Sequence, residues 1–446
     1  MITEINELYG RQTNALDIAP ALRSHADVQS RPSMQINTQS VICNRCGMQT
    51  NKSAAALPHQ QYYCPQCINL GRIVSNVDLA FVAEPNQFQV LDRPLTWTGQ
   101  LTKDQADCSA TIIEHFQQRK AHLLWAVTGA GKTEMLFPGI EWALANGLRI
   151  AIASPRVDVC IELFPRLQAA FANTPMILLH GRQTEKYQYS QLTVCTTHQL
   201  LRFYHAFDIL IIDEVDSFPY ANNPGLHFAV SQAVKTTGTQ LYLTATPNDE
   251  LLRLVKRNQL SISYLPLRFH RHLLPQIKLH LIPNWRQRLL KKRLPNRLIR
   301  VIDQKVTDGQ RFLLFVPHVK DLKPIEEALR AKLSSGAKMM TVHSEDAKRL
   351  EKVTAMREQR LDFLITTTIL ERGVTFPGID VIVLGADEPI FSPSALVQIA
   401  GRVGRKNDRP DGNVDFWVHS NARNVSKAYQ QIAHMNKLGA LKLRDA

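Results

Sequence analysis

The stretch Ala126–Thr133, AVTGAGKT, has the composition of a loop that binds phosphate groups. It follows an apolar run and opens a helical pattern, so its backbone N–H groups can converge on phosphate oxygens at a helix N-terminus. The glycines allow this close approach, Lys132 can supply charge to the β- and γ-phosphates, and Thr133 can offer a hydroxyl to Mg²⁺. The strict pattern begins with glycine, whereas Ala126 stands here, and the alternative is a glycine-rich turn without a ligand. The residues expected to contact the nucleotide in this loop are Thr128, Gly129, Ala130, Gly131, Lys132 and Thr133.

Three carboxylates lie in the stretch DEVD at 213–216, directly after the apolar run 207–212. At the end of a buried strand, Asp213 could hold Mg²⁺, through water because this ion loses its hydration shell reluctantly. Glu214 could then orient and deprotonate the attacking water, and Asp216 is expected to act as a relay toward a nucleic-acid side. By itself the run could be a solvated turn. Together with the phosphate loop it predicts a site that hydrolyses a nucleotide.

Four of the seven cysteines form two pairs, Cys43-x2-Cys46 and Cys64-x2-Cys67. This spacing is typical of a structural zinc site with four thiolate ligands, and an iron–sulfur cluster is the alternative. Four thiolates close the coordination shell, so a catalytic metal is not expected. The remaining cysteines are interpreted as packing residues, and they are Cys108, Cys160 and Cys195.

The whole chain has 446 residues and a formal charge of +14, which favours a polyanionic partner such as nucleic acid or an acidic membrane surface. Its apolar runs are short of the roughly 20 residues that a spanning helix needs, and residues 1–10 show no secretory signal. We therefore expect a cytoplasmic protein, with attachment to the inner face of the membrane through a partner as an option.

The elements that must position these groups alternate between short apolar runs and helical windows. Strands are predicted at 121–127, 148–154, 192–196, 207–213 and 240–245, and a helix at 133–147 with Gly147 at its C-terminal end. A second series of strands is predicted at 311–316, 338–343, 361–367 and 379–385, with a closing helix over 421–446. This alternation predicts an α/β fold with parallel sheets covered by helices.

The predicted organisation has five parts, each lobe with a core of its own. They are a partly flexible arm (1–38), a zinc module (39–76), a first lobe that binds ATP (77–265), a linker (266–285) and a second lobe (286–446). The stretch 285–300 carries seven Lys or Arg residues and no acid.

Several stretches, in order, resemble the motifs of superfamily-two helicases and translocases of the DEAD/DEAH-like type. They are 126–133, SPR at 154–156, TTHQLLR at 196–202, DEVD at 213–216, TATP at 244–247, TTTILERGVTF at 366–376 and QIAGRVGR at 398–405. The resemblance implies two RecA-like P-loop lobes over roughly 95–420.

That resemblance also implies roles for individual residues. Gln105 matches the glutamine that recognises adenine, and Thr244 and Thr246 match the motif that links hydrolysis to lobe movement. Gln398, Arg402 and Arg405 match the last motif, whose arginines serve the γ-phosphate. Coupling or nucleic-acid contacts are implied for Pro155, Arg156, Thr196, Thr197 and Thr367. Many relatives have Asp where Thr375 stands, so ribose recognition at that point is not expected.

A four-cysteine module ahead of such a motor is similar to the ComFA family, the competence ATPases of Gram-positive bacteria. The helicase PriA has related motor motifs, but its zinc cysteines lie within the second lobe. The resemblance implies ATP-driven translocation of single-stranded DNA into the cytoplasm during natural transformation, with a ComFC-type protein and a DNA-uptake channel as partners. The alternatives are a duplex-unwinding helicase acting on DNA or RNA, and a zinc-ribbon DNA-binding module that a nucleotide only switches. The presence of Glu214, Arg402 and Arg405 argues against the binding module.

Overall fold

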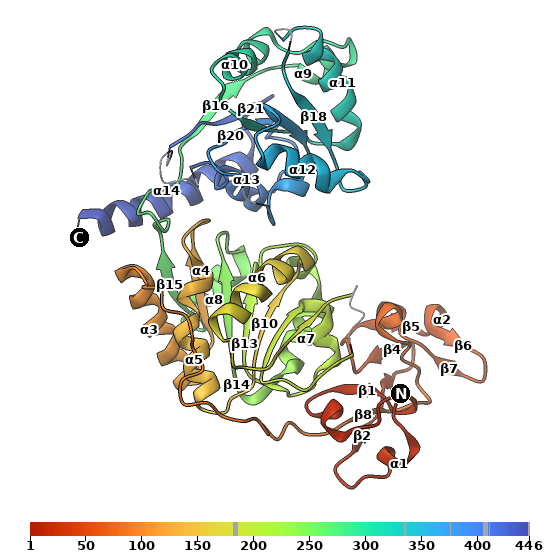
Figure 1. Ribbon diagram of the computed structural model, residues 1–446. Coiled ribbons are helices and arrows are strands. Elements are labelled where there is room, and N and C mark those ends of the chain that lie inside the picture. The colour runs from red at the N-terminus through yellow and green to blue at the C-terminus, as the bar shows by residue number, and fades with distance from the viewer. Residues whose placement is uncertain (182–185, 334–335, 375, 405–408, 410, 445–446) are drawn as a thin grey trace. The chain divides into compact units, whose positions relative to one another are not determined.

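Two parallel sheets form the framework of the protein, one in each of the two units into which the chain divides (Figure 1). The computed structural model describes residues 1–181, 186–333, 336–374, 376–404, 409 and 411–444. One unit contains Met1–Trp125 and Lys132–Tyr264, and the other contains Ala126–Gly131 and Leu265–Ala446. Within the described ranges, no helix is both long and apolar enough to cross a membrane.

The sheet of the first unit has seven strands in the order β11-β12-β10-β13-β14-β9-β15. Strands β9, β10 and β12 are buried along their whole length, as expected for a parallel sheet covered on both faces. The strands are β9 (His122–Ala126), β10 (Ile150–Ser154), β11 (Met176–Leu179), β12 (Leu192–Thr196), β13 (Phe207–Asp213), β14 (Val234–Thr244) and β15 (Ser261–Leu265). The helices are α3 (Lys103–Gln117), α4 (Lys132–Met135), α5 (Phe137–Ala145), α6 (Val157–Ala170), α7 (Pro224–Ala233) and α8 (Asp249–Lys256).

The helix predicted over 133–147 is two helices, α4 and α5. Pro138 lies in the first turn of α5, where its missing N–H costs nothing but where it cannot continue the preceding helix. Asn146 caps α5, and Gly147 follows it with φ +66°, the left-handed conformation predicted at this end.

The sheet of the second unit has six parallel strands in the order β16-β21-β20-β17-β19-β18. The strands are β16 (Ile277–Leu281), β17 (Phe312–Phe315), β18 (Met339–Val342), β19 (Phe363–Thr366), β20 (Asp380–Leu384) and β21 (Val414–Val418). The helices are α9 (Trp285–Leu290), α10 (Asn296–Thr307), α11 (Val319–Arg330), α12 (Arg349–Arg357), α13 (Pro393–Ala400) and α14 (Arg423–Arg444). Because β16 is an edge strand of this sheet, the second half of the predicted linker 266–285 is part of the second lobe.

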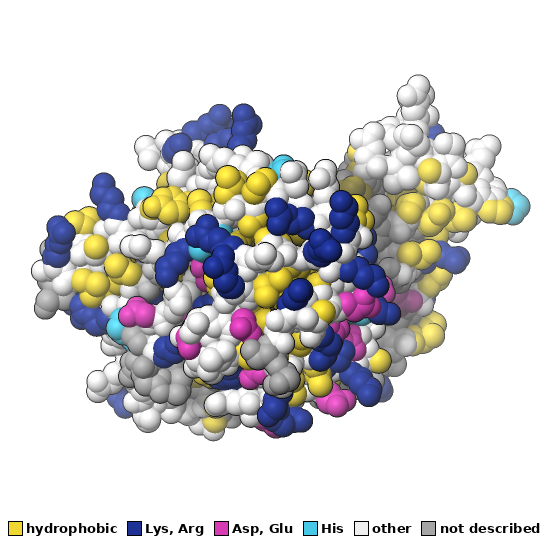
Figure 2. Space-filling model, turned by 90° about the horizontal axis from the view of Figure 1, so that it is seen from above, with side chains coloured by type: hydrophobic (Ala, Val, Ile, Leu, Met, Phe, Trp, Pro, Cys, Tyr) yellow, Lys and Arg dark blue, Asp and Glu magenta, His cyan; other side chains and the backbone are white. Residues whose placement is uncertain are grey.

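The basic stretch 285–300 forms α9 and the start of α10. Its exposed cations are Arg288, Lys291, Lys292, Arg293, Arg297 and Arg300. Figure 2 shows Lys and Arg side chains spread over much of one face of the molecule. This distribution agrees with the polyanionic partner expected from the net charge.

Residues 1–38 are folded, which corrects the expectation of a partly flexible arm. β1 (Gln12–Asn14) and β2 (Gln29–Arg31) both pair antiparallel with β8 (Leu79–Phe81), and α1 (Pro20–Arg23) lies between them in sequence. Leu8 and Ile18 are fully buried in a small cluster with Ala80 and Val82. The predicted boundary at 76/77 is therefore also wrong, because β8 belongs with β1 and β2. We call residues 1–31 and 77–82 the N-terminal subdomain.

The four-cysteine module lies between β2 and β8 in sequence. It contains one small sheet of β3 (Met34–Ile36), β4 (Ser40–Cys43) and β5 (Gln49–Asn51), and a second of β6 (Ala56–Leu57) and β7 (Gln61–Tyr62). The short helix α2 (Lys52–Ala55) joins them.

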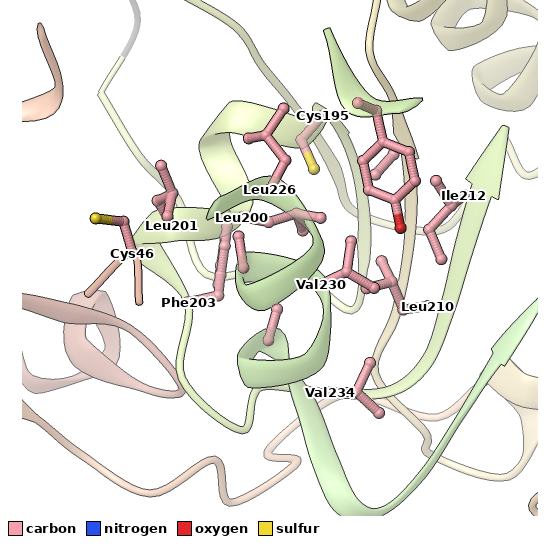
Figure 3. Packing of buried hydrophobic residues seen from close by; sticks show 14 of the residues in the cluster. Cys46, Cys195, Leu200, Leu201, Phe203, Leu210, Ile212, Leu226, Val230 and Val234 are labelled. Atoms are coloured by element: carbon pink, nitrogen blue, oxygen red, sulfur yellow. The ribbon is translucent and has the colours of Figure 1, made fainter. Parts of the chain in front are cut away.

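The module shares one hydrophobic core with the first lobe. All four paired cysteines belong to the same buried cluster as Leu201 and Leu226, and Figure 3 shows Cys46 within it. An added Cβ at Gly47 would lie 2.6 Å from the ring of Phe228 on α7, so the module and this helix are in close contact. A change at the cysteines is therefore expected to reach the first lobe.

Candidate nucleotide site and four-cysteine centre

The phosphate loop has the backbone that its glycines predict. Gly129 and Gly131 have φ of +80° and +73°, conformations that residues with a Cβ rarely adopt. A Cβ added at Gly129 would have no described atom within 4 Å, so conformation rather than crowding requires glycine there. The backbone N–H of Phe269 donates to the carbonyl of Gly129 at 2.9 Å, and that of Val127 donates to Leu265 at 3.0 Å. These bonds tie the backbone of the loop to the segment 265–269.

The structure brings Lys132 and the DEVD stretch together. The ammonium Nζ of Lys132 lies 3.9 Å from Oδ1 of Asp213, at the carboxyl end of β13. Burial raises the pKa of the Asp213 carboxyl, Lys132 lowers it, and Glu214 and Asp216 raise it further. A divalent cation beside Asp213 would offset the charge that these carboxylates concentrate. Thr133 follows Lys132 in α4, so hydroxyl and carboxylate oxygens suited to Mg²⁺ come from α4 and β13.

Glu214 occupies a constrained position. Its φ is +56°, uncommon for a residue with a side chain, and its backbone N–H donates to Oδ1 of Asp213 at 2.9 Å. Such strain is characteristic of functional sites, where the surrounding structure fixes one side-chain direction.

Asp216 connects the DEVD stretch to the stretch TATP. The hydroxyls of Thr244 and Thr246 donate to its two carboxylate oxygens at 2.7 and 2.5 Å, and the N–H of Thr246 donates to Oγ1 of Thr244 at 2.9 Å. Both threonines are buried, Thr244 at the end of β14. Asp216 is thus hydrogen-bonded to the end of β14 and to the loop that follows it.

Gln105 has a local structural role that sequence reasoning missed. Its Oε1 accepts a hydrogen bond from the backbone N–H of Thr102 at 2.9 Å, while its own N–H donates to the hydroxyl of Thr102 at 3.3 Å. This reciprocal capping box starts α3, and the spacing Thr-x-x-Gln could have revealed it. The predicted contact of Gln105 with adenine remains a prediction.

The other predicted residues of the first unit lie at the carboxyl ends of its strands. Pro155 and Arg156 follow β10, with Arg156 at the start of α6, and Thr196 and Thr197 end β12 and begin a 3-10 turn. The parallel strands place these residues at the same sheet edge as Asp213.

In the second unit, Thr367 follows β19, and Gln398 and Arg402 lie in and just after α13. All three are buried, and Nε of Arg402 donates to the carbonyl of Glu371 at 3.1 Å. Arg405 and Thr375 lie outside the described residues.

The two cysteine pairs converge into one buried cluster. Their Sγ atoms all lie within 4.8 Å of one another, with 3.9 Å between Cys43 and Cys67 and 3.6 Å between Cys46 and Cys64. Four sulfurs placed tetrahedrally about 2.3 Å from Zn²⁺ would be about 3.8 Å apart. The described cysteines form no disulfides, so the four sulfurs fit a metal ion.

Arg45, between the first two cysteines, also belongs to this centre. Its Nε lies 3.3 Å from Sγ of Cys67, and its guanidinium donates to the carbonyls of Cys67 and Gly71 at 2.9 and 2.6 Å. Four thiolates around a divalent cation carry a net charge of −2, which a buried arginine partly offsets.

The remaining cysteines are buried, in agreement with a packing role. The thiol of Cys160 donates to the carbonyl of Cys195 at 3.2 Å, and burial raises the pKa of Cys160 to about 12. A thiol with that pKa is protonated and unreactive at neutral pH.

Comparison with known proteins places this architecture in a family. A model described as competence protein ComFA N-terminal domain matches residues 12–81, and "Competence protein ComFA" of Bacillus subtilis is 42% identical over 93% of this chain and 89% of its own. The chain belongs to the ComFA family. "Competence protein ComFA" of Streptococcus pneumoniae is 40% identical over 92% of this chain and 94% of its own.

Two further models cover the lobes of this family member. One described as type III restriction enzyme, res subunit, matches residues 98–249, and one described as helicase conserved C-terminal domain matches residues 293–407. The solved structure of Saccharomyces cerevisiae Dbp5 bound to RNA and ADP BeF3 is similar in fold, with a TM-score of 0.55, 17% identity, and coverage of 76% of this chain and 88% of that one. The chain therefore has two RecA-like lobes of the superfamily-two type and is a helicase-like ATPase of the competence family.

Proposed function

We propose that the protein is an ATP-driven motor that moves single-stranded DNA, serving the uptake of transforming DNA in natural competence. Lys132, Asp213 and Glu214 lie together and suit hydrolysis. The observation that carries this proposal is that Asp216, in the same DEVD stretch, is hydrogen-bonded to Thr244 and Thr246. A simple nucleotide switch needs the first three groups, whereas a motor also needs a path from the reaction to a moving loop. Membership of the ComFA family supports the biological setting.

In the proposed reaction, Lys132 neutralises charge on the β- and γ-phosphates, and the open glycine loop supplies backbone N–H groups to them. Bound Mg²⁺, held by Thr133 and Asp213, would stabilise the charge that develops between the β- and γ-phosphates. Glu214 orients the attacking water and accepts its proton. The family motif assigns Arg402 and Arg405 to stabilisation of the transferring phosphoryl group, and Gln105 to adenine.

The coupling step begins at Asp216. Its two carboxylate oxygens hold the hydroxyls of Thr244 and Thr246, so a change at Glu214 or Asp213 on hydrolysis shifts the loop after β14. We assign strand contacts to Pro155, Arg156, Thr196 and Thr197, because their strands end at the same edge as β13, and to Thr367 in the second unit. Contacts of this kind with the backbone would be independent of DNA sequence.

We assign zinc to Cys43, Cys46, Cys64 and Cys67, because their sulfur separations suit a tetrahedral site. A closed shell of four thiolates gives this ion a structural role in holding the module against α7. By family relationship, we also propose a ComFC-type protein and the DNA-uptake channel as partners.

The experiment that tests the proposal is the steady-state rate of ATP hydrolysis with single-stranded DNA, duplex DNA and RNA in parallel. We expect poly-dT to stimulate the parent protein most, and Glu214→Gln to bind ATP without turnover. Equal parent rates with and without DNA would refute the motor and favour a nucleotide-switched binding module. Stronger stimulation by duplex DNA or by RNA would favour a helicase acting on that nucleic acid.

A further inference from the structure

A polar cavity of about 310 Å³ lies where three parts of the first unit meet. The N-terminal subdomain contributes Arg11, the four-cysteine module contributes Asn69, and the first lobe contributes His180, Tyr187 and Arg202. The volume is at the lower end of the range of ligand sites, roughly 300–1,000 Å³. The cavity is separate from the phosphate loop and from the cysteine sulfurs, whose residues are not among those that line it.

The described side chains that line this cavity carry positive charge. None of the described residues that line it is acidic, and two are arginines. The guanidinium of Arg11 lies 3.8 Å from the ring centroid of Tyr187, and its NH1 donates to the carbonyl of Glu7 at 2.9 Å, so its position is fixed by neutral groups. Nε of Arg202 is buried and has no hydrogen-bond partner within the described part of the chain. A buried donor without a partner is rare in proteins and suggests an acceptor supplied by a ligand.

Electrostatics support an anionic ligand. Burial lowers the pKa of Arg11, and the charge of Arg202 lowers it further against the opposing effect of Tyr187. Burial likewise lowers the pKa of Arg202, as does Arg45, while Asp17 raises it. Because an arginine guanidinium is always charged in proteins, burying these two groups carries a desolvation cost that a bound anion would offset.

The position of the cavity indicates where such an anion would come from. Of its lining residues, Leu179 ends β11, and His180 and Gly181 follow it. Gln199 and Arg202 lie in the 3-10 turn that follows β12, and Phe203 comes directly after that turn. The parallel pairing of these strands with β10 and β13 puts their carboxyl ends at the edge that also carries Asp213. We propose that this cavity binds a backbone phosphate of single-stranded DNA, held by Arg11 and Arg202 at the junction of the first lobe with the four-cysteine module. This inference rests on the proposed function and gives the module a place beside the DNA path.

The test compares the full-length parent with Arg202→Gln, and with Lys120→Gln as a matched control. Lys120 is an exposed cation two residues before β9, at the opposite edge of the same sheet. Fluorescence anisotropy with a labelled oligo-dT across a salt series gives the slope of log affinity against log salt. Each phosphate contact to a single strand contributes about 0.7 to the magnitude of this slope. We expect Arg202→Gln to lower it by about that amount and Lys120→Gln to leave it unchanged.

A second arm distinguishes DNA from free phosphate as the source of the anion. Thermal unfolding is measured in inorganic phosphate and in chloride at equal ionic strength. Phosphate could protect the parent but not Arg202→Gln, while the two proteins have identical slopes with DNA. That result would overturn the assignment to DNA in favour of a free-phosphate site. No difference between the parent and the variant in either arm would overturn the site itself.

Arg11→Gln provides an independent variant in case Arg202→Gln does not fold, and the same change in slope is expected for it. A parent protein that binds no DNA would refute the proposed function and the DNA assignment together. A parent that binds DNA, with slopes that neither arginine changes, would refute only this inference.

Discussion

The ion pair between Arg149 and Glu84, two residues beyond the end of the N-terminal subdomain, provides a quantitative test of how this subdomain is attached to the first lobe. Both side chains are fully buried and in direct contact. The guanidinium of Arg149 also donates to the carbonyl of Tyr9 at 2.9 Å and to the hydroxyl of Tyr187 at 2.7 Å. Arg149 directly precedes β10, so this one cation joins the main sheet to two segments near the N-terminus.

The change Arg149→Met removes the charge and keeps most of the volume. It leaves the Glu84 carboxylate buried without its charged partner, and breaking a buried pair in this way costs about 3–5 kcal/mol. With a urea dependence of about 3 kcal/mol/M, the unfolding midpoint should fall by about 1–1.7 M. The matched control is Arg166→Met, because Arg166 forms an exposed ion pair with Glu134, and such pairs contribute about 0–1 kcal/mol.

The assay is urea unfolding followed by tryptophan fluorescence, with Glu84→Gln and the double variant completing a mutant cycle. The double variant should be more stable than the sum of the two single effects predicts, by about 1–3 kcal/mol, because no buried charge remains unpaired. Additive effects, or an Arg149→Met variant no less stable than Arg166→Met, would show that the pair does not hold the subdomain to the sheet.

Three further predictions concern pH and turnover. Burial, and His115 beside it, lower the pKa of His122 to about 3. Because the folded pKa is below the unfolded value, the protein loses stability as the pH falls below about 6.5. The expected loss at pH 5 is about 2 kcal/mol. His122→Gln should reduce this loss in unfolding experiments at pH 7.5 and 5, and equal losses would contradict the assignment. Lys132→Ala should abolish hydrolysis, whereas Glu214→Gln should retain nucleotide binding measured by fluorescence; hydrolysis by the glutamine variant near the parent rate would refute a base role. The Arg405→Ala variant should still bind ATP and DNA, but its rate of DNA-stimulated ATP hydrolysis should fall by roughly a thousandfold. If DNA stimulated this variant as it does the parent, Arg405 would not act in the transition state.

Much of the first lobe could be predicted from the sequence because its central strands are buried on both faces. The runs that became β10 and β13 are apolar over nearly their full length and are bounded by polar residues. β16 was missed because it is an edge strand whose side chains are mostly exposed, which removes the apolar signal. β21 has the buried run VDFWV, which a closer search of the sequence could have found.

The N-terminal subdomain could not be predicted by the same means. Its strands β1, β2 and β8 have three residues each, too few to show a period of two. Their stability comes from pairing between segments far apart in sequence, and from the contact of Gly10 with the start of β13. An added Cβ at Gly10 would lie 2.7 Å from Cβ of Ala206.

The site shows the same division between local and long-range information. Lys132, Asp213 and Glu214 lie in motifs whose spacing indicates their chemistry, and the structure brings Lys132 to Asp213. The contacts of Arg45 with Cys67 and of Arg149 with Glu84 span 22 and 65 residues, so no local pattern specifies them. An arginine within a Cys-x-x-Cys pair next to a predicted thiolate site is nevertheless a signal that could be sought in other sequences.

The central claim, that hydrolysis drives movement along single-stranded DNA, is tested most directly by displacement of streptavidin from a biotinylated oligo-dT. The parent protein should speed release of streptavidin from one end of the oligonucleotide when ATP is present, and Glu214→Gln should not. The rate of release from the opposite end should remain at its spontaneous value. DNA-stimulated hydrolysis without accelerated release from either end would contradict directional movement.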